Sequence, residues 1–134
     1  MNPRILSALG LAALILGTAA AMNYAQSRGL IDADIADRAM QVVVGLVLAG
    51  YANLMPKQLG RPRGAPAAEA AAQSVRRVGG LVMSLGGLAW AAIWALAPMS
   101  LTMPLGIAAV ASATAVTLGY GLWAWRRCRG AERA

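Results

Sequence analysis

The stretch Gly50-Tyr51-Ala52-Asn53-Leu54-Met55-Pro56-Lys57 decides the fold, because an apolar segment ends there and the most basic part of the chain begins. Proline cannot continue a helix without losing a backbone hydrogen bond, so Pro56 marks a helix end. Apolar chain resumes at Val78 and runs to Trp125 without a charged residue. This pattern is typical of a helical hairpin that turns at a membrane surface.

The composition also indicates a membrane protein. The 134 residues are 59% hydrophobic and 13% charged, with a mean hydropathy of +0.59. A soluble domain of this size exposes much of its area and needs more polar surface. The net charge of +7 is gathered between long apolar blocks. That distribution is typical of cytoplasmic loops and argues against a nucleic-acid-binding surface.

The apolar blocks predict an all-α integral membrane protein with a single domain. A membrane-spanning helix needs about 20 apolar residues, and we expect four such spans arranged as two antiparallel hairpins. They should cover residues 5–25, 38–55, 78–97 and 104–125, with a basic loop at 56–77 and a tight turn between Pro98 and Pro104. Within the loop, the composition favours a short helix that starts near Pro66. Asp34 or Asp37 is expected to cap the second span.

The first span has an alternative interpretation as a secretory signal peptide. Arg4 would form the basic region, Ile5–Leu16 the apolar region and Ala19-Ala20-Ala21 the cleavage site. The small residues of this segment equally suit a retained helix that packs closely against another. The sequence leaves both interpretations open.

The distribution of Lys and Arg predicts the orientation. Ten of these residues would lie on one side of the membrane and only Arg28 and Arg38 on the other. Basic residues accumulate on the cytoplasmic side, so both termini and the long loop are expected there. The ten are Arg4, Lys57, Arg61, Arg63, Arg76, Arg77, Arg126, Arg127, Arg129 and Arg133.

The central stretch resembles a known family. Asn53-Leu54-Met55-Pro56-Lys57 is similar to the Asn-x-Leu/Met-Pro-Lys signature of the SdpI-like bacterial membrane proteins, and Arg77-Val78-Gly79-Gly80 resembles the start of that family's next helix. The resemblance covers about Gly45–Trp94 and implies a multi-pass protein of the bacterial inner membrane with an immunity-like role. The loop differs from the family pattern in its Arg61-Pro62-Arg63 run and in having no histidine.

Candidate binding residues cluster around this stretch. An amide near the membrane boundary needs a partner, so Asn53 is expected to bond to the third span or the basic loop. The arginines would attract anionic lipid headgroups, at about 1 kcal/mol each near a charged leaflet. The predicted binding set is Asn53, Pro56, Lys57, Arg61, Arg63, Arg76 and Arg77.

Small residues spaced by four predict close helix packing, as in other membrane helices. The predicted packing set is Gly17, Gly45, Ala49, Gly80, Ser84, Gly87, Ala115 and Gly119. Hydroxyl groups in the spans are expected to bond to a carbonyl of their own helix or of a neighbouring helix. Trp94 is expected to anchor the outer lipid interface.

The predicted function is non-enzymatic. The chain has no histidine, and apart from Arg38 at the start of the second span the spans contain no carboxylate, lysine or arginine, so we expect neither catalysis, nor a metal, nor a cofactor. Two functions remain: an accessory, assembly or immunity-like subunit that acts by helix packing, or an oligomeric small-solute permease or channel. The expected partners are the lipid bilayer, its anionic headgroups, and a membrane protein or further copies of this chain.

Overall fold

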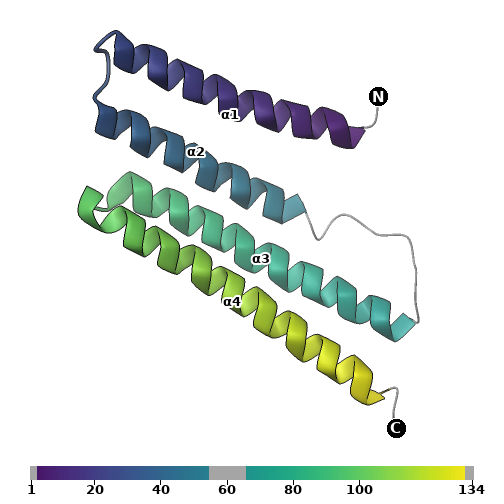
Figure 1. The fold of residues 1–134 in the computed structure, drawn as a ribbon. Helices are drawn as coiled ribbons and strands as arrows, with labels where there is room; N and C mark the ends of the chain where they lie inside the picture. Colours follow the sequence, from purple (N-terminus) through teal and green to yellow (C-terminus); the bar gives the residue numbers. More distant parts are fainter. Residues whose placement is uncertain (1–2, 55–65, 132–134) are drawn as a thin grey trace.

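The computed structural model describes residues 3–54 and 66–131, which form four helices and two short connections. The helices are α1 (Pro3–Ser27), α2 (Ala33–Leu54), α3 (Pro66–Leu96) and α4 (Met99–Ala131) (Figure 1). Each is long and apolar enough to cross a membrane. The prediction of an all-α protein with four candidate membrane spans is therefore confirmed.

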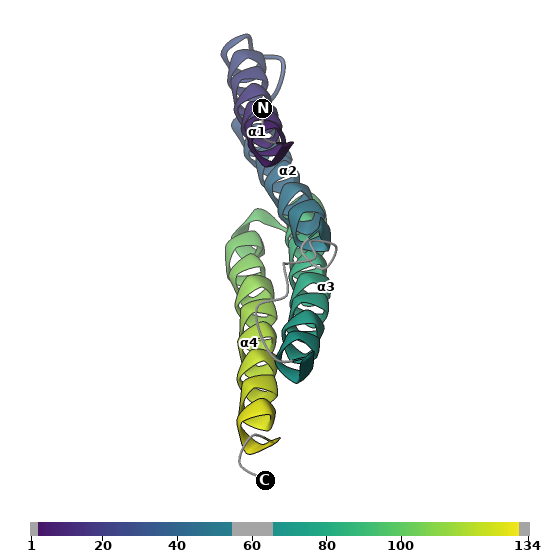
Figure 2. The ribbon, with the colours of Figure 1, turned by 90° about the vertical axis from the view of Figure 1, so that its right-hand side faces the viewer.

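The four helices lie in one open row in the order of the sequence, and each runs antiparallel to the next (Figure 1). The contact between α2 and α3 is the most extensive, that between α3 and α4 is slightly smaller, and α1 contacts only α2. Within the described residues, α4 contacts neither α1 nor α2. Figure 2 shows the same elongated arrangement from the side. The row therefore has two edge helices, α1 and α4.

Local backbone bonds set the ends of α1 and α2. Gly29 has a φ of 67°, and its N–H and that of Leu30 donate to Gln26 and Ala25 at 3.0 and 2.9 Å. This pattern closes a helix and favours glycine, because other residues rarely adopt that φ. α2 starts directly after Asp32, whose carbonyl accepts the Ala36 N–H. The prediction of Asp34 or Asp37 as the cap is wrong, since both lie inside the helix.

The ends of α3 and α4 also differ in part from expectation. α3 begins at Pro66, a position that suits proline at a helix start, and continues unbroken to Leu96. A helix from Pro66 is therefore confirmed, and residues 66–77 of the expected loop are helical. The predicted turn between Pro98 and Pro104 is wrong, because α4 begins at Met99 and contains Pro104. So close to a helix start, a proline leaves only the Ser100 carbonyl without its helical donor.

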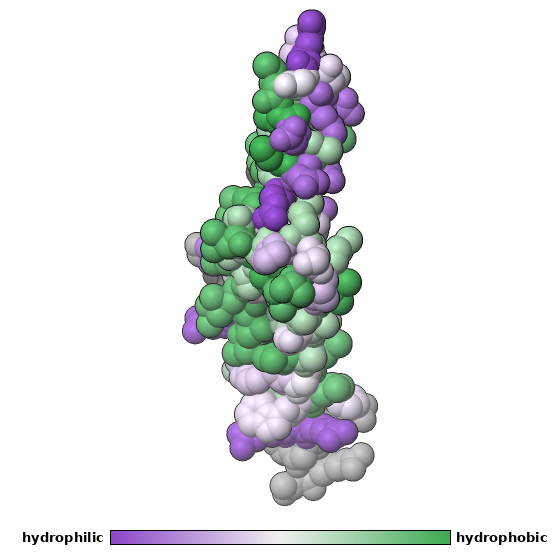
Figure 3. All heavy atoms as spheres, turned by 90° about the vertical axis from the view of Figure 1, so that its left-hand side faces the viewer, coloured by the Kyte–Doolittle hydropathy of each residue, from purple (hydrophilic) through white to green (hydrophobic). Residues whose placement is uncertain are grey.

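The buried residues are mostly small. They include Ala36, Gly45, Ala49 and Ala52 of α2, whereas large side chains such as Leu16, Leu81 and Leu118 are more than half exposed. Figure 3 shows hydrophobic residues over the middle of one face, between hydrophilic residues at its two ends. Helices with close backbone contacts and large apolar side chains outside suit a lipid surrounding.

Candidate functional site

The contact between α2 and α3 is the tightest part of the molecule. A Cβ atom added to Gly45 would lie 2.7 Å from the Gly87 carbonyl oxygen and 2.8 Å from the Ala91 nitrogen. One added to Gly87 would lie 2.7 Å from the Ala49 nitrogen and 2.8 Å from the Gly45 carbonyl oxygen. The two backbones touch, so neither glycine can accept a side chain without moving a helix. Only glycine fits at these two positions.

Two hydrogen bonds cross the same contact. Ser84 Oγ donates to the Ala49 carbonyl at 3.0 Å, and Arg38 Nη1 donates to the Trp94 carbonyl at 3.0 Å. Trp94 lies in the last turn of α3, where carbonyls lack helical donors and the helix end is partly negative. The Arg38 guanidinium donates a hydrogen bond to such a carbonyl, and its positive charge is attracted to the partly negative helix end. From the sequence alone Arg38 is only a flanking charge, because no local pattern shows which distant carbonyl an arginine will reach.

Two tryptophans fill the space next to this bond. A Cβ atom at Gly106 of α4 would lie 2.9 Å from Trp90 Cζ3, and the Trp90 and Trp94 rings have centroids 6.1 Å apart. Trp94 is only 6% exposed, so the prediction that it anchors the lipid interface is wrong. Arg38 holds its backbone against α2, and its ring turns inward. The Nε1 atoms of both tryptophans are buried without a hydrogen-bond partner.

The contact between α3 and α4 also depends on small residues. A Cβ atom at Gly86 would lie 2.9 Å from Ala113 Cβ, and one at Gly79 would lie 3.0 Å from Thr117 Cγ2. Here each glycine faces a side chain, whereas Gly45 and Gly87 face backbone. The Thr117 methyl can move by rotation of its side chain, whereas Ala113 Cβ is fixed to the α4 backbone, so the α3–α4 contact is also tight at Gly86.

The hydroxyl groups of the spans bond as predicted. Thr18, Ser112, Thr114 and Thr117 donate to the carbonyl four residues earlier at 2.7–2.8 Å. Ser84 instead donates to the neighbouring helix. These five hydroxyls therefore serve to satisfy and connect backbone groups.

The predicted packing set divides into two groups. Gly45, Ala49, Ser84 and Gly87 meet in the α2–α3 contact, and Gly80 is buried on α3. In contrast, Gly17, Ala115 and Gly119 are exposed. Around Gly17 and Gly119 no atom lies within 4 Å of an added Cβ. The first group holds the row together, and the second lies on its edge helices.

The predicted binding set is described only in part. Asn53 is exposed in the last turn of α2, and Arg76 and Arg77 are exposed on α3. The other four members, Pro56, Lys57, Arg61 and Arg63, lie outside the described residues.

On α4, the Arg127 guanidinium lies 4.5 Å from the centre of the Trp123 ring, which in turn lies 5.4 Å from the Tyr120 ring. We call the helix ends that carry Arg76, Arg77, Arg126 and Arg127, near the start of α3 and the end of α4, the basic end.

The comparisons with known proteins give no family. No protein-family model, curated protein or solved structure matches this chain. Among the residues that the structure describes, no group of three or more His, Cys, Asp or Glu side chains could hold a metal ion. The resemblance to the SdpI-like proteins stays a hypothesis that rests on its motif residues.

Proposed function

We propose that this chain is a non-enzymatic membrane protein that acts through helix–helix contacts, as an accessory, assembly or immunity-like subunit of a complex in the bacterial inner membrane. The α2–α3 contact supports this proposal most directly. Its glycines, alanines and serine all serve to bring two backbones together. The hydroxyls at membrane depth donate to backbone carbonyls, so they are engaged in structure and not directed at a solute.

We further propose that both termini and the basic end face the cytoplasm. The ten-to-two distribution of Lys and Arg supports this orientation. Single cysteines in a Cys128→Ser background test it. A maleimide that does not cross membranes should label Asp32→Cys in intact cells and should label Gly64→Cys only after permeabilisation. The reverse pattern would contradict the orientation.

The basic end is the proposed partner-binding surface, together with Asn53. Asn53, Arg76 and Arg77 are exposed, so their side chains are free to contact a partner protein or anionic headgroups. In the antiparallel row, the end of α2 and the start of α3 point in the same direction (Figure 1), which would place them on one side of a membrane. The SdpI-like resemblance, which falls on these residues, adds support for an immunity-like role.

Co-purification with partner chains tests this function. We expect a specific membrane protein to co-purify in mild detergent, and Asn53→Leu combined with Arg76→Gln and Arg77→Gln should remove it without lowering the folded yield. Arg28→Gln is the matched control, because Arg28 is exposed at the opposite end of the row. Equal recovery of the partner with the triple variant and with the control would contradict the proposed surface.

A small-solute permease is the second candidate, and the open row is the observation that favours it. Four helices in one layer enclose no channel, but several rows arranged in a ring could enclose one. Purified chain in vesicles should then transport a solute at a saturable rate. Such transport without a further protein would replace the accessory function.

A further inference from the structure

The two edge helices lack the second neighbour that the inner helices have. α2 and α3 each contact two antiparallel helices, whereas α1 contacts only α2 and α4 contacts only α3 within the described chain. No residue in the most apolar 18-residue stretch of α1 is buried. The row therefore stops at α1 and α4, although the pattern that builds it could continue.

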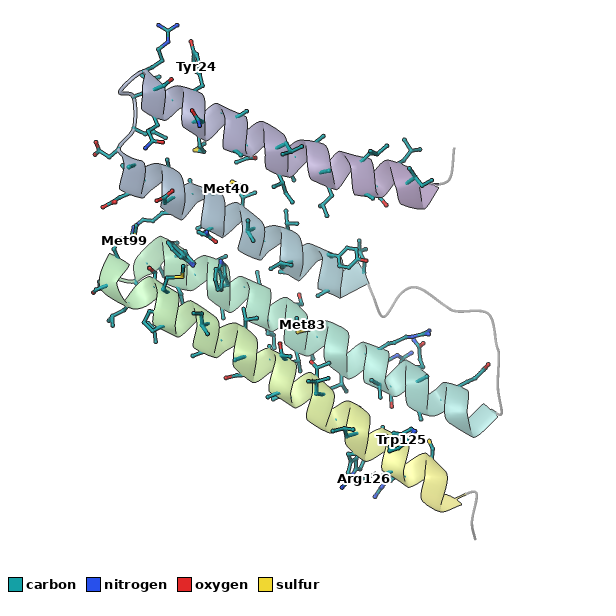
Figure 4. All side chains as sticks on the ribbon, in the orientation of Figure 1. Tyr24, Met40, Met83, Met99, Trp125 and Arg126 are labelled. Atoms are coloured by element: carbon teal, nitrogen blue, oxygen red, sulfur yellow. The ribbon has the colours of Figure 1, made fainter. Side chains whose placement is uncertain are left out.

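The outward side of α1 is uncharged and is lined with small residues. Leu6, Gly10, Ala13, Gly17, Ala20 and Tyr24 follow one another at intervals of three and four, which places them on one helix face, and all are exposed. Figure 4 shows Tyr24 on the side of α1 away from α2. We call these six residues the α1 edge face.

The outward side of α4 has the same character. Leu105, Ala108, Ser112, Ala115, Gly119 and Leu122 follow the same intervals, and all are exposed. Arg126 comes one turn later, and Figure 4 shows it pointing away from α3. We call the six residues from Leu105 to Leu122 the α4 edge face.

The exposed area is large enough for a stable interface. The chain exposes 9394 Å², about 2,800 Å² more than the roughly 6,600 Å² expected for a compact chain of this mass. A stable interface between proteins needs about 800 Å² from each partner. This surplus belongs to the chain as a whole, and the two unpaired edge helices contribute to it.

The glycines of the edge faces lie in open space. On the inner helices, Gly45, Gly86 and Gly87 each face another helix closely, whereas Gly50 of α2 is open. On the edge faces, Gly10, Gly17 and Gly119 have no atom within 4 Å of an added Cβ. Small residues in membrane helices let backbones approach, and lipid gains little from them.

We propose that the edge faces bind a second copy of this chain, with α1 of one copy packed against α4 of the next. This deepens the proposed function by naming one helix partner. The contact would be antiparallel, like all three contacts within the row (Figure 1). A contact of α4 with α4 of a second copy in the same orientation would be parallel, and it would bring two Arg126 side chains to one seam. Like charges repel there, whereas the α1 edge face carries no charge.

Cross-linking between two differently labelled chains tests the pairing. In a Cys128→Ser background, Ala13→Cys chains and Ala108→Cys chains are mixed before reconstitution into vesicles and treated with a bifunctional maleimide. The mixture should give at least tenfold more cross-linked dimer than either chain alone. Stronger linking within the Ala108→Cys chains alone, or no linking above an Ala92→Cys baseline, would overturn the proposal.

A matched pair of leucine substitutions separates association from folding. Ala108→Leu and Ala92→Leu make the same change at exposed positions, but Ala92 lies on α3, which already has two neighbours. Ala108→Leu should weaken dimer formation at least tenfold at the same melting temperature, and Ala92→Leu should not weaken it. A wild-type chain that is monomeric in vesicles would refute this inference. The proposed function has its own test: it would still be supported if the triple variant at Asn53, Arg76 and Arg77 lost the co-purifying partner protein.

Discussion

The two neighbours of α2 contact it in very different ways. Against α3, Gly45 and Ala49 meet Gly87 and Ala91 so closely that an added Cβ would lie under 3 Å from backbone atoms. Against α1, the contact is sparse, and Gly10 and Gly17 of α1 lie on its outward side, away from α2, with no atom within 4 Å of an added Cβ. Both helices carry small residues at intervals of three and four. Such spacing therefore allows a close contact but does not by itself produce one.

The α2–α3 contact is close because small residues of one helix face small residues of the other. Gly45 faces Gly87 at the same depth, and the Ser84 and Arg38 bonds hold the two helices in register. The outward small residues of α1 have no facing helix in this chain. We infer that the α2–α3 contact is the stable centre of the molecule and that α1 is held mainly by its connection to α2 and by lipid.

The largest expected effect is that of leucine at the central glycines. Gly45→Leu or Gly87→Leu should lower the free energy of unfolding by about 3 kcal/mol or more, because the added side chain meets backbone that cannot yield. Thermal unfolding in mixed micelles measures this change. Gly17→Leu is the control in open space and should change stability by about 0.5 kcal/mol or less. Equal losses at positions 17 and 87 would remove the distinction between the two contacts.

The next effect is that of removing the arginine bond. Arg38→Leu should destabilise the fold by about 1–3 kcal/mol, because it leaves the Trp94 carbonyl unsatisfied at the end of α3. Trp94 fluorescence should shift to longer wavelength as water reaches the buried ring. Arg38→Lys keeps the charge and should retain part of the stability. No change in either measurement would show that Arg38 does not connect α2 to α3.

A smaller effect is expected at the serine that crosses the contact. Ser84→Ala should cost about 0.6 kcal/mol, the average for hydrogen bonds between membrane helices, and no more than about 1.7 kcal/mol. Ser112→Ala is the matched control, because Ser112 donates within its own helix, and its cost should be close to zero. If the control loses as much stability as Ser84→Ala, the bond to Ala49 contributes nothing specific.

The smallest effect on stability is expected at Asn53. Its exposed side chain predicts that Asn53→Leu changes the free energy of unfolding by no more than about 0.5 kcal/mol. The same substitution should still reduce partner co-purification. A loss above about 1.5 kcal/mol would instead show that Asn53 supports the helix contacts, as the sequence alone suggested.

The sequence predicted four apolar helices of membrane-spanning length, because charge-free blocks of that length have few other interpretations. It also predicted Gly45, Ala49, Ser84 and Gly87 as packing residues. It could not separate them from Gly17 and Gly119, since spacing shows which residues share a face and not what lies opposite. The Arg38 bond and the burial of Trp94 depend on α2, α3 and α4 together, so no local pattern indicated them. Pro104 was misassigned because proline is tolerated near a helix start.

The central claim is that α2 packs onto α3 through direct backbone contact at Gly45. Its most direct test compares Gly45→Ala with Gly50→Ala, two changes in the same helix, since Gly50 has no atom within 4 Å of an added Cβ. The gain in helix propensity, about 1 kcal/mol, is common to both and cancels in the difference. We predict that Gly45→Ala unfolds with a free energy at least about 2 kcal/mol lower than Gly50→Ala. Agreement of the two variants within about 0.5 kcal/mol would contradict the claim.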